Sequence, residues 1–153
     1  GMHKDIEGFL EAKDTLDQNT TDFVHSVLAG RKVLMFEQVL YGSINGLDIT
    51  GKPDLILLDD QGRITVVDWK SSVTLYPEML MQGVAYDFLV KQNQEYYFGS
   101  VEIWSTTSLL KIGSIELSSD YHFYLEQLNR TIDTFKFLEQ FKKRKGETQN
   151  NDV

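Results

Sequence analysis

Two apolar segments separated by a short turn constrain the fold of this chain most strongly. Residues 55–58 (Leu-Ile-Leu-Leu) and 64–67 (Ile-Thr-Val-Val) are apolar or β-branched throughout, and Asp60-Gln61-Gly62 lies between them. Continuous runs of this kind are typical of strands that are covered on both faces. The turn residues favour a hairpin in which Gly62 adopts a positive φ. The sequence therefore predicts a hairpin at the buried centre of a sheet.

The rest of the chain predicts further strands, with helices around them. Apolar residues at helical spacing predict helices over 3–17 and from the cap Thr20 or Thr21 to Gly30. The segments rich in β-branched and aromatic residues predict strands over 32–41, 47–59, 63–70, 96–105 and 109–117. Pro77 begins a helix to about 92, and Ser118 or Ser119 caps a long one to about 145. We expect an α/β (α+β) fold, with a central mixed sheet flanked by helices.

Length and composition exclude several classes of protein. The chain has 153 residues, of which 41% are hydrophobic and 25% charged, so we expect a single folded domain over residues 2–146 and a disordered tail over 147–153. It contains no Cys, which excludes disulfide scaffolds and thiol nucleophiles. No apolar run approaches the ~18 residues that a membrane span needs. We therefore expect a cytoplasmic protein without a membrane partner.

The charge of the chain is strongly acidic and unevenly distributed. The formal net charge is −8, which repels nucleic acid at long range. Carboxylates that hold a divalent cation contribute to that sum, so it does not exclude a nucleic-acid substrate. A third of the basic residues lie near the C-terminus: Lys136, Lys142, Lys143, Arg144 and Lys145.

The central hairpin predicts a cluster of charged groups at one end. If the hairpin turns about Gln61, Ile56 faces Val66, Asp54 faces Asp68, and directly opposed Cβ atoms are about 5 Å apart. Because side chains alternate along a strand, Asp68 and Lys70 share a face while Trp69 points away. Two such carboxylates repel each other unless one is protonated or a cation lies between them, and oxygen ligands suit Mg²⁺.

The helix after this hairpin supplies a second wall. Gln82 and Tyr86 are four residues apart and lie on one helical face, which Leu89 continues. Glu37 lies in the middle of a predicted strand, an unfavourable place for an acid unless it faces the same site. Taken singly, each of these features has an ordinary explanation: a turn at 51–54, a polar helix surface, or a charge on an edge strand. Their order along the chain brings them to one place.

The ordered set resembles a known family. Gly51-Lys52-Pro53-Asp54, the Val-Val-Asp-Trp-Lys-Ser-Ser stretch at 66–72 and the Gln82…Tyr86 pair resemble the PD-(D/E)XK nuclease superfamily, within it the RecB-like and mitochondrial-genome-maintenance-exonuclease-like branch. The resemblance implies a restriction-endonuclease-like αβββαβ core. It also implies a metal-dependent deoxyribonuclease, an exonuclease or single-strand nuclease acting in DNA recombination, repair or replication.

The resemblance also implies a role for each matching residue. Asp54, Asp68 and the backbone carbonyl of Trp69 would hold Mg²⁺ or Mn²⁺, with Glu37 and His3 completing the metal shell. Lys70 would orient or help deprotonate the attacking water, and Gln82 and Tyr86 would position the phosphate or strand. His25 on the next predicted helix is a rival to His3, whereas His122 is interpreted as a surface residue.

Three hypotheses about function follow. In the first, the protein is this nuclease, and its partner is DNA, either single-stranded or with free ends. A homo-oligomer and a recombination or replication partner are the alternatives for its assembly. In the second, the domain keeps the nuclease fold but is a catalytically inactive nucleic-acid-binding or interaction module. In the third, it is an unrelated mixed α/β interaction domain, which requires Asp54 and Asp68 to lie far apart.

Overall fold

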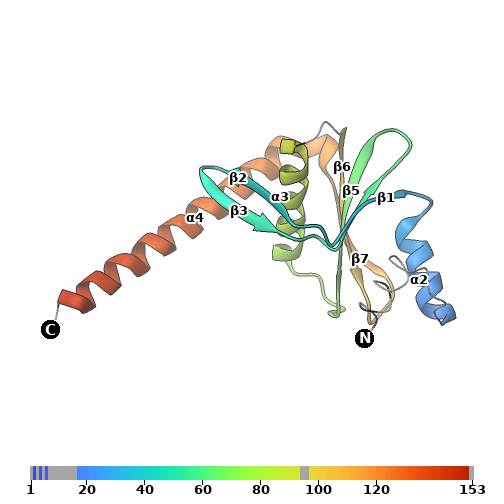
Figure 1. Ribbon diagram of the computed structural model, residues 1–153, viewed down its shortest axis with the longest axis horizontal. Coiled ribbons are helices and arrows are strands. Elements are labelled where there is room, and N and C mark those ends of the chain that lie inside the picture. Colours follow the sequence, from blue (N-terminus) through green and yellow to red (C-terminus); the bar gives the residue numbers. More distant parts are fainter. Residues whose placement is uncertain (1, 3, 5, 7–16, 94–96, 152–153) are drawn as a thin grey trace.

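The computed structural model describes the chain apart from residues 1, 3, 5, 7–16, 94–96 and 152–153 (Figure 1). In chain order, its elements are α2 (Gln18–Leu28), β1 (Lys32–Phe36), β2 (Leu40–Ile44), β3 (Leu47–Gly51), β4 (Leu55–Leu58), β5 (Arg63–Lys70), α3 (Pro77–Asn93), β6 (Tyr97–Ser105), β7 (Lys111–Glu116) and α4 (Leu117–Asn151). Most of the helix predicted over 3–17 lies outside the described residues.

Among the described strands, five form a mixed sheet in the order β1-β4-β5-β6-β7. The pair β5–β6 is parallel and is connected by α3, while the other neighbours are antiparallel. Strands β2 and β3 form a separate hairpin beside α3 (Figure 1). The order α2-β1-β4-β5-α3-β6 is the predicted αβββαβ core, with the hairpin inserted after its first strand. The predicted fold class, a mixed sheet flanked by helices, is confirmed.

The prediction of single strands over 32–41 and 47–59 is wrong. Each segment is divided between the main sheet and the β2–β3 hairpin. The chain leaves the main sheet at Glu37, which has a left-handed φ of 46°, and returns to it after Pro53, which has no N–H to give to a ladder. Both segments stay rich in strand-forming residues across the break, so the sequence pattern does not mark it.

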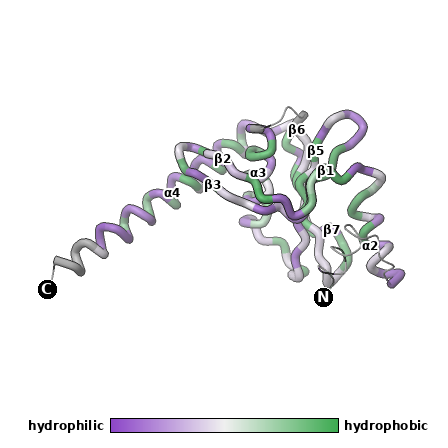
Figure 2. Tube along the Cα trace, in the orientation of Figure 1, coloured by the Kyte–Doolittle hydropathy of each residue, from purple (hydrophilic) through white to green (hydrophobic). Residues whose placement is uncertain are grey.

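The sheet separates two hydrophobic clusters, which explains the continuous apolar runs of its central strands. Ile56, Ile64 and Val66 face α3 and the β2–β3 hairpin, while Leu57 and Val67 face the cluster of α2. All five are essentially inaccessible to solvent. In Figure 2 the hydrophobic colouring follows these central strands and α3. Alternate residues of β5 therefore face different helices, and Asp68 falls on the α3 side.

The helix ends differ in detail from the prediction. The N-cap of α2 is Asp17, whose carboxylate accepts a hydrogen bond from the Thr20 N–H, rather than Thr20 or Thr21. Helix α4 spans Leu117–Asn151, with a break at Asp120, whose φ of −132° and ψ of 32° are not helical. Its end falls in the range for which the sequence predicts a disordered tail. Within the described part of the chain, no helix combines the length and the apolar character that crossing a membrane requires.

Candidate active site

The register of the central hairpin is the one that the sequence predicts. Leu58 pairs with Ile64, and Ile56 pairs with Val66. At the turn, Gly62 has a positive φ of 79°, and Arg63 is ion-paired with Asp59. The turn therefore fixes which residues reach the opposite end of the hairpin, where Asp54 and Asp68 lie.

Asp54 is held against the neighbouring strand by its own side chain. It precedes β4, and its Oδ2 accepts a hydrogen bond of 3.0 Å from the backbone N–H of Trp69. Its carbonyl oxygen accepts a hydrogen bond of 3.1 Å from the Glu37 N–H at the end of β1. The carboxylate of Asp54 is thereby fixed to the residue that follows Asp68 on β5.

Lys70 connects Asp68 with helix α3. Its Nζ lies 3.4 Å from Oδ2 of Asp68 and 3.5 Å from Oε1 of Gln82. The Asp68 side chain is 6% exposed, whereas that of Lys70 is 33% exposed. The structure thus brings together a buried carboxylate, a lysine that still reaches solvent, and an amide from the facing helix.

Tyr86 lies one turn further along α3 and is mostly buried. Burial raises the pKa of its hydroxyl, and the negative charges of Asp68 and Asp54 raise this pKa further. A hydrogen bond with the Lys52 backbone has the opposite, smaller effect and lowers the pKa. The negative charges of both carboxylates therefore act on the Tyr86 phenol. The ring leaves no room at Gly51, where a Cβ would lie 2.3 Å from Tyr86 Cε1.

The sequence analysis missed the backbone support of Lys70. The Thr106 N–H donates a hydrogen bond of 2.8 Å to the Lys70 carbonyl, and the Thr107 hydroxyl donates one of 2.6 Å to the Ser71 carbonyl. Thr106 follows Ser105, which is the parallel partner of Lys70 in the sheet. Recognising β5 and β6 as a parallel pair is the signal that could have found these threonines.

The other predicted site residues are placed as follows. The side chain of Trp69 points into the α2 cluster on the opposite face of the sheet, as predicted. Glu37 does not lie mid-strand, because β1 ends at Phe36. His3 lies outside the described residues. Its rival His25 is exposed on α2, and His122 is exposed on α4.

The donor set suits a hard cation with few protein ligands. No three His, Cys, Asp or Glu side chains among the described residues converge as a metal-binding group. Asp54 and Asp68 supply carboxylate oxygens from adjacent strands. Mg²⁺ is commonly held by one or two carboxylates, and it takes its remaining ligands from water and substrate phosphate. The two aspartates therefore fit the binding of such an ion together with a phosphate ligand.

This carboxylate–lysine cluster lies in a domain of the nuclease-type hydrolase class. The family model described as the PD-(D/E)XK nuclease superfamily matches residues 10–150, and the chain belongs to this superfamily. Nucleases of the superfamily generally use divalent metals such as Mg²⁺ and act on nucleic acid. A comparison with curated proteins gave no match. Membership excludes the third hypothesis, an unrelated interaction domain.

Proposed function

We propose that the protein is a metal-dependent deoxyribonuclease that hydrolyses DNA phosphodiester bonds. The observation that carries the proposal is the position of Lys70, whose Nζ lies within 3.5 Å of both Asp68 and Gln82. Asp54 is tied to the same strand through the Trp69 N–H. A cationic group that is partly exposed beside a buried carboxylate is suited to a phosphate and an attacking water.

Each residue has a defined part in this chemistry. Asp54 and Asp68 would hold the cation, which supplies Lewis acidity and a hydroxide near neutral pH. The water oxygen forms a bond to phosphorus while the bond to the leaving oxygen breaks, and protons from water end on the products. Lys70 orients the water and stabilises the charge that develops on the phosphate. Gln82 holds Lys70 from α3, and Tyr86 supports the Gly51–Asp54 segment through the Lys52 backbone.

The finer assignment is part of the same proposal. The Gln82…Tyr86 pair on α3 and the Asp-Trp-Lys-Ser-Ser sequence support a RecB-like exonuclease, or a single-strand nuclease, that acts in the cytoplasm in DNA recombination, repair or replication. Roles for Glu37, His3 and the Trp69 carbonyl in the metal shell stay predictions. The alternative is an inactive nuclease-fold module that binds nucleic acid or a partner.

Degradation assays with substrates of different topology test the proposal. End-labelled single-stranded, double-stranded and circular single-stranded DNA are incubated with the protein and Mg²⁺ or Mn²⁺, with EDTA as the control. We expect metal-dependent degradation of linear DNA, and an exonuclease should leave the circle intact. Cleavage of the circle would replace the exonuclease assignment by an endonuclease, and the absence of any metal-dependent cleavage would support the inactive module.

Calorimetry with Mn²⁺ tests the metal ligands separately from activity. Asp54→Asn should lower the affinity for Mn²⁺ at least tenfold, since it removes a charged oxygen ligand. Asp59→Asn is the matched control, because Asp59 lies at the opposite end of the same hairpin and is paired with Arg63. Equal Mn²⁺ binding by the wild-type protein and Asp54→Asn would exclude Asp54 as a ligand.

A further inference from the structure

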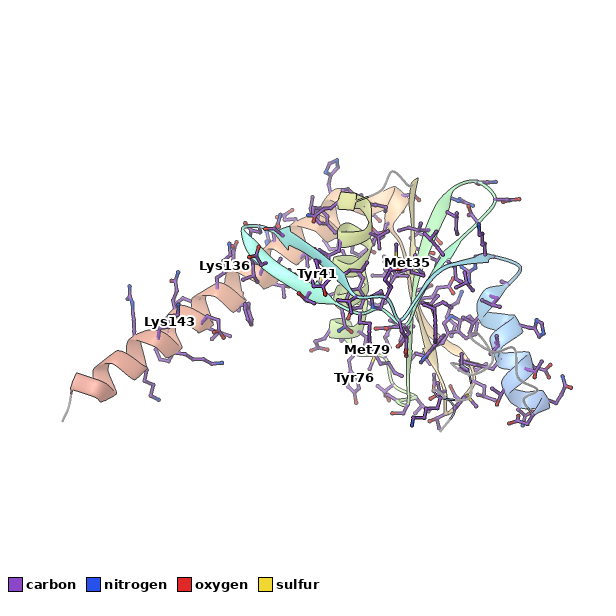
Figure 3. The ribbon with its side chains drawn as sticks, viewed as in Figure 1. Met35, Tyr41, Tyr76, Met79, Lys136 and Lys143 are labelled. Atoms are coloured by element: carbon purple, nitrogen blue, oxygen red, sulfur yellow. The ribbon has the colours of Figure 1, made fainter. Side chains whose placement is uncertain are left out.

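The C-terminal part of α4 extends beyond the body of the domain (Figure 1). We call residues 134–146 of α4 the arm. Ile132 is the last buried residue of α4 that the structure describes. The tip of the β2–β3 hairpin holds the start of the arm, where Lys136 Nζ donates to the Asn45 carbonyl and Asn45 donates to Asp133. Lys143 lies well beyond this contact (Figure 3).

The arm exposes large apolar side chains. Phe135 is 49% exposed and Leu138 is 47% exposed, and Phe137 and Phe141 are more exposed still. A helical segment of ~13 residues that contacts the domain only at its start is of marginal stability in water. Exposed apolar side chains that gather on a helix are typical of an interaction surface.

Phe135 and Leu138 continue a stripe that begins inside the domain. Leu128, Thr131, Phe135 and Leu138 are spaced by three, four and three residues, which is the spacing of a helix–helix seam. Leu128 and Thr131 line a cavity of about 390 Å³ between α3 and α4, whose other walls include Met81 and Ala85. One half of the stripe therefore lines a cavity, and the other half is exposed on the arm.

The charge of the arm is opposite to that of the rest of the chain. The arm has five Lys and Arg residues and one Glu, which give it a formal charge of +4. Because the whole chain has a charge of −8, the residues outside the arm have a charge of −12. A partner of the arm should therefore combine an apolar groove with an acidic surface. The domain body offers both, since Glu78 lies at the same cavity.

We propose that the stripe binds α4 of a second copy of this chain in an antiparallel, two-fold symmetric pair. Leu138 of each copy then enters the α3–α4 cavity of the other beside Leu128, and Phe135 lies against Thr131. This pairing brings the basic end of each arm close to Asp120 of the other copy. A parallel pairing would instead place the two basic ends together, which like charges disfavour. The two-fold arrangement makes one surface complementary to itself.

Sedimentation velocity of the full chain over a range of concentrations tests this proposal. We expect the wild-type protein to form a dimer, and Phe135→Glu or Leu138→Glu to raise its dissociation constant at least tenfold. Phe137→Glu is the matched control, because Phe137 is even more exposed but lies about 200° around the helix from Phe135. Thermal unfolding at low concentration establishes that the variants fold.

Three results would overturn the proposal. A wild-type chain that stays monomeric at all concentrations would exclude the pair. If Phe137→Glu raised the dissociation constant of the dimer as much as Phe135→Glu does, the stripe would be excluded as the dimer interface. A monomer that binds a single-stranded oligonucleotide in EDTA, and loses this binding in Lys142→Glu/Lys143→Glu, would assign the arm to nucleic acid instead. Because these experiments need neither metal nor cleavage, their failure is distinct from failure of the proposed nuclease activity.

Discussion

Two clusters of acidic and basic side chains lie on opposite faces of the same sheet. On the α3 face, Asp68 of β5 meets Lys70 at 3.4 Å. On the α2 face, Glu102 of β6 meets Arg31, which donates two hydrogen bonds of 3.0 and 3.1 Å to its carboxylate. Asp68 and Glu102 are both largely buried and lie on adjacent strands. Their surroundings nevertheless differ.

The difference lies in how fully the charged groups are satisfied. Trp104 Nε1 donates a third hydrogen bond to Glu102, and Arg31 also donates to the Val27 and Leu28 carbonyls at the end of α2. Lys70 makes longer contacts than the ~2.8 Å of a good charge-assisted hydrogen bond, and a third of its side chain is exposed. We infer that the Arg31 cluster ties α2 to the sheet, whereas the Lys70 cluster can receive a ligand. Substitutions in the two clusters should therefore separate stability from activity.

The largest expected effect is the loss of activity in Lys70→Ala. Removal of a group that stabilises developing charge typically lowers kcat by about 10²–10³-fold. The free energy of unfolding should fall less than in a variant that breaks the Arg31–Glu102 pair, because the Lys70–Asp68 contact is longer and a third of the lysine side chain is exposed. Single-turnover cleavage of labelled DNA and urea unfolding measure the two quantities.

Arg63→Ala is the control for this substitution. Arg63 lies on the same strand, at its other end, and its ion pair with Asp59 is exposed. Its removal should leave the cleavage rate unchanged within about twofold. Equal rates for the wild-type protein and Lys70→Ala would remove Lys70 from the mechanism, and equal losses in both variants would mean that the effect is not specific to the site.

The second prediction concerns stability alone. Arg31→Met leaves the Glu102 carboxylate buried without its ion-pair partner, and breaking a buried pair in this way costs about 3–5 kcal/mol. Urea unfolding should show this loss, while folded protein keeps its cleavage rate. The double variant Arg31→Met/Glu102→Leu should recover most of the stability, because it removes the unpaired charge as well. A single variant as stable as the wild type would show that the cluster does not tie α2 to the sheet.

The sequence could predict one of these clusters and not the other, for a physical reason. The site depends on a short hairpin, in which the turn at Gly62 and strict alternation fix where Asp68 and Lys70 point. Arg31 and Glu102 are 71 residues apart, and they meet only through strand pairing that no local pattern specifies. The turn at Glu37 was unpredictable for a related reason: its left-handed backbone accompanies a hydrogen bond from its N–H to the Asp54 carbonyl, which is a tertiary contact.

A third, smaller effect should show that the Lys70 cluster depends on close packing around it. In Gly51→Ala the new Cβ would meet the ring of Tyr86, so the ring or the 51–54 segment must shift. Overpacking of this kind costs about 1–3 kcal/mol, and the shift should also lower the cleavage rate because it moves Asp54. Gly146→Ala is the control, since a Cβ there meets nothing within 4 Å. Unchanged unfolding and cleavage in Gly51→Ala would mean that the Tyr86 contact does not hold the site.

The smallest expected effect concerns pH. The loss of unfolding free energy caused by Arg31→Met should depend on the pH at which it is measured. Burial alone would raise the pKa of Glu102, but the hydrogen bonds from Arg31 and Trp104 and the charge of Arg31 lower it overall. In the wild-type protein Glu102 therefore contributes stability that is present above its unfolded pKa and is lost as the pH falls through the lower folded pKa. Without Arg31, burial should instead raise the pKa of Glu102 in the folded protein. Protonation then removes the buried, unpaired charge as the pH falls, and the variant regains stability. The difference in unfolding free energy between the two proteins should thus be smaller at pH 4 than at pH 7. An equal difference at both values would attribute the loss to packing of the Arg31 side chain and not to its charge.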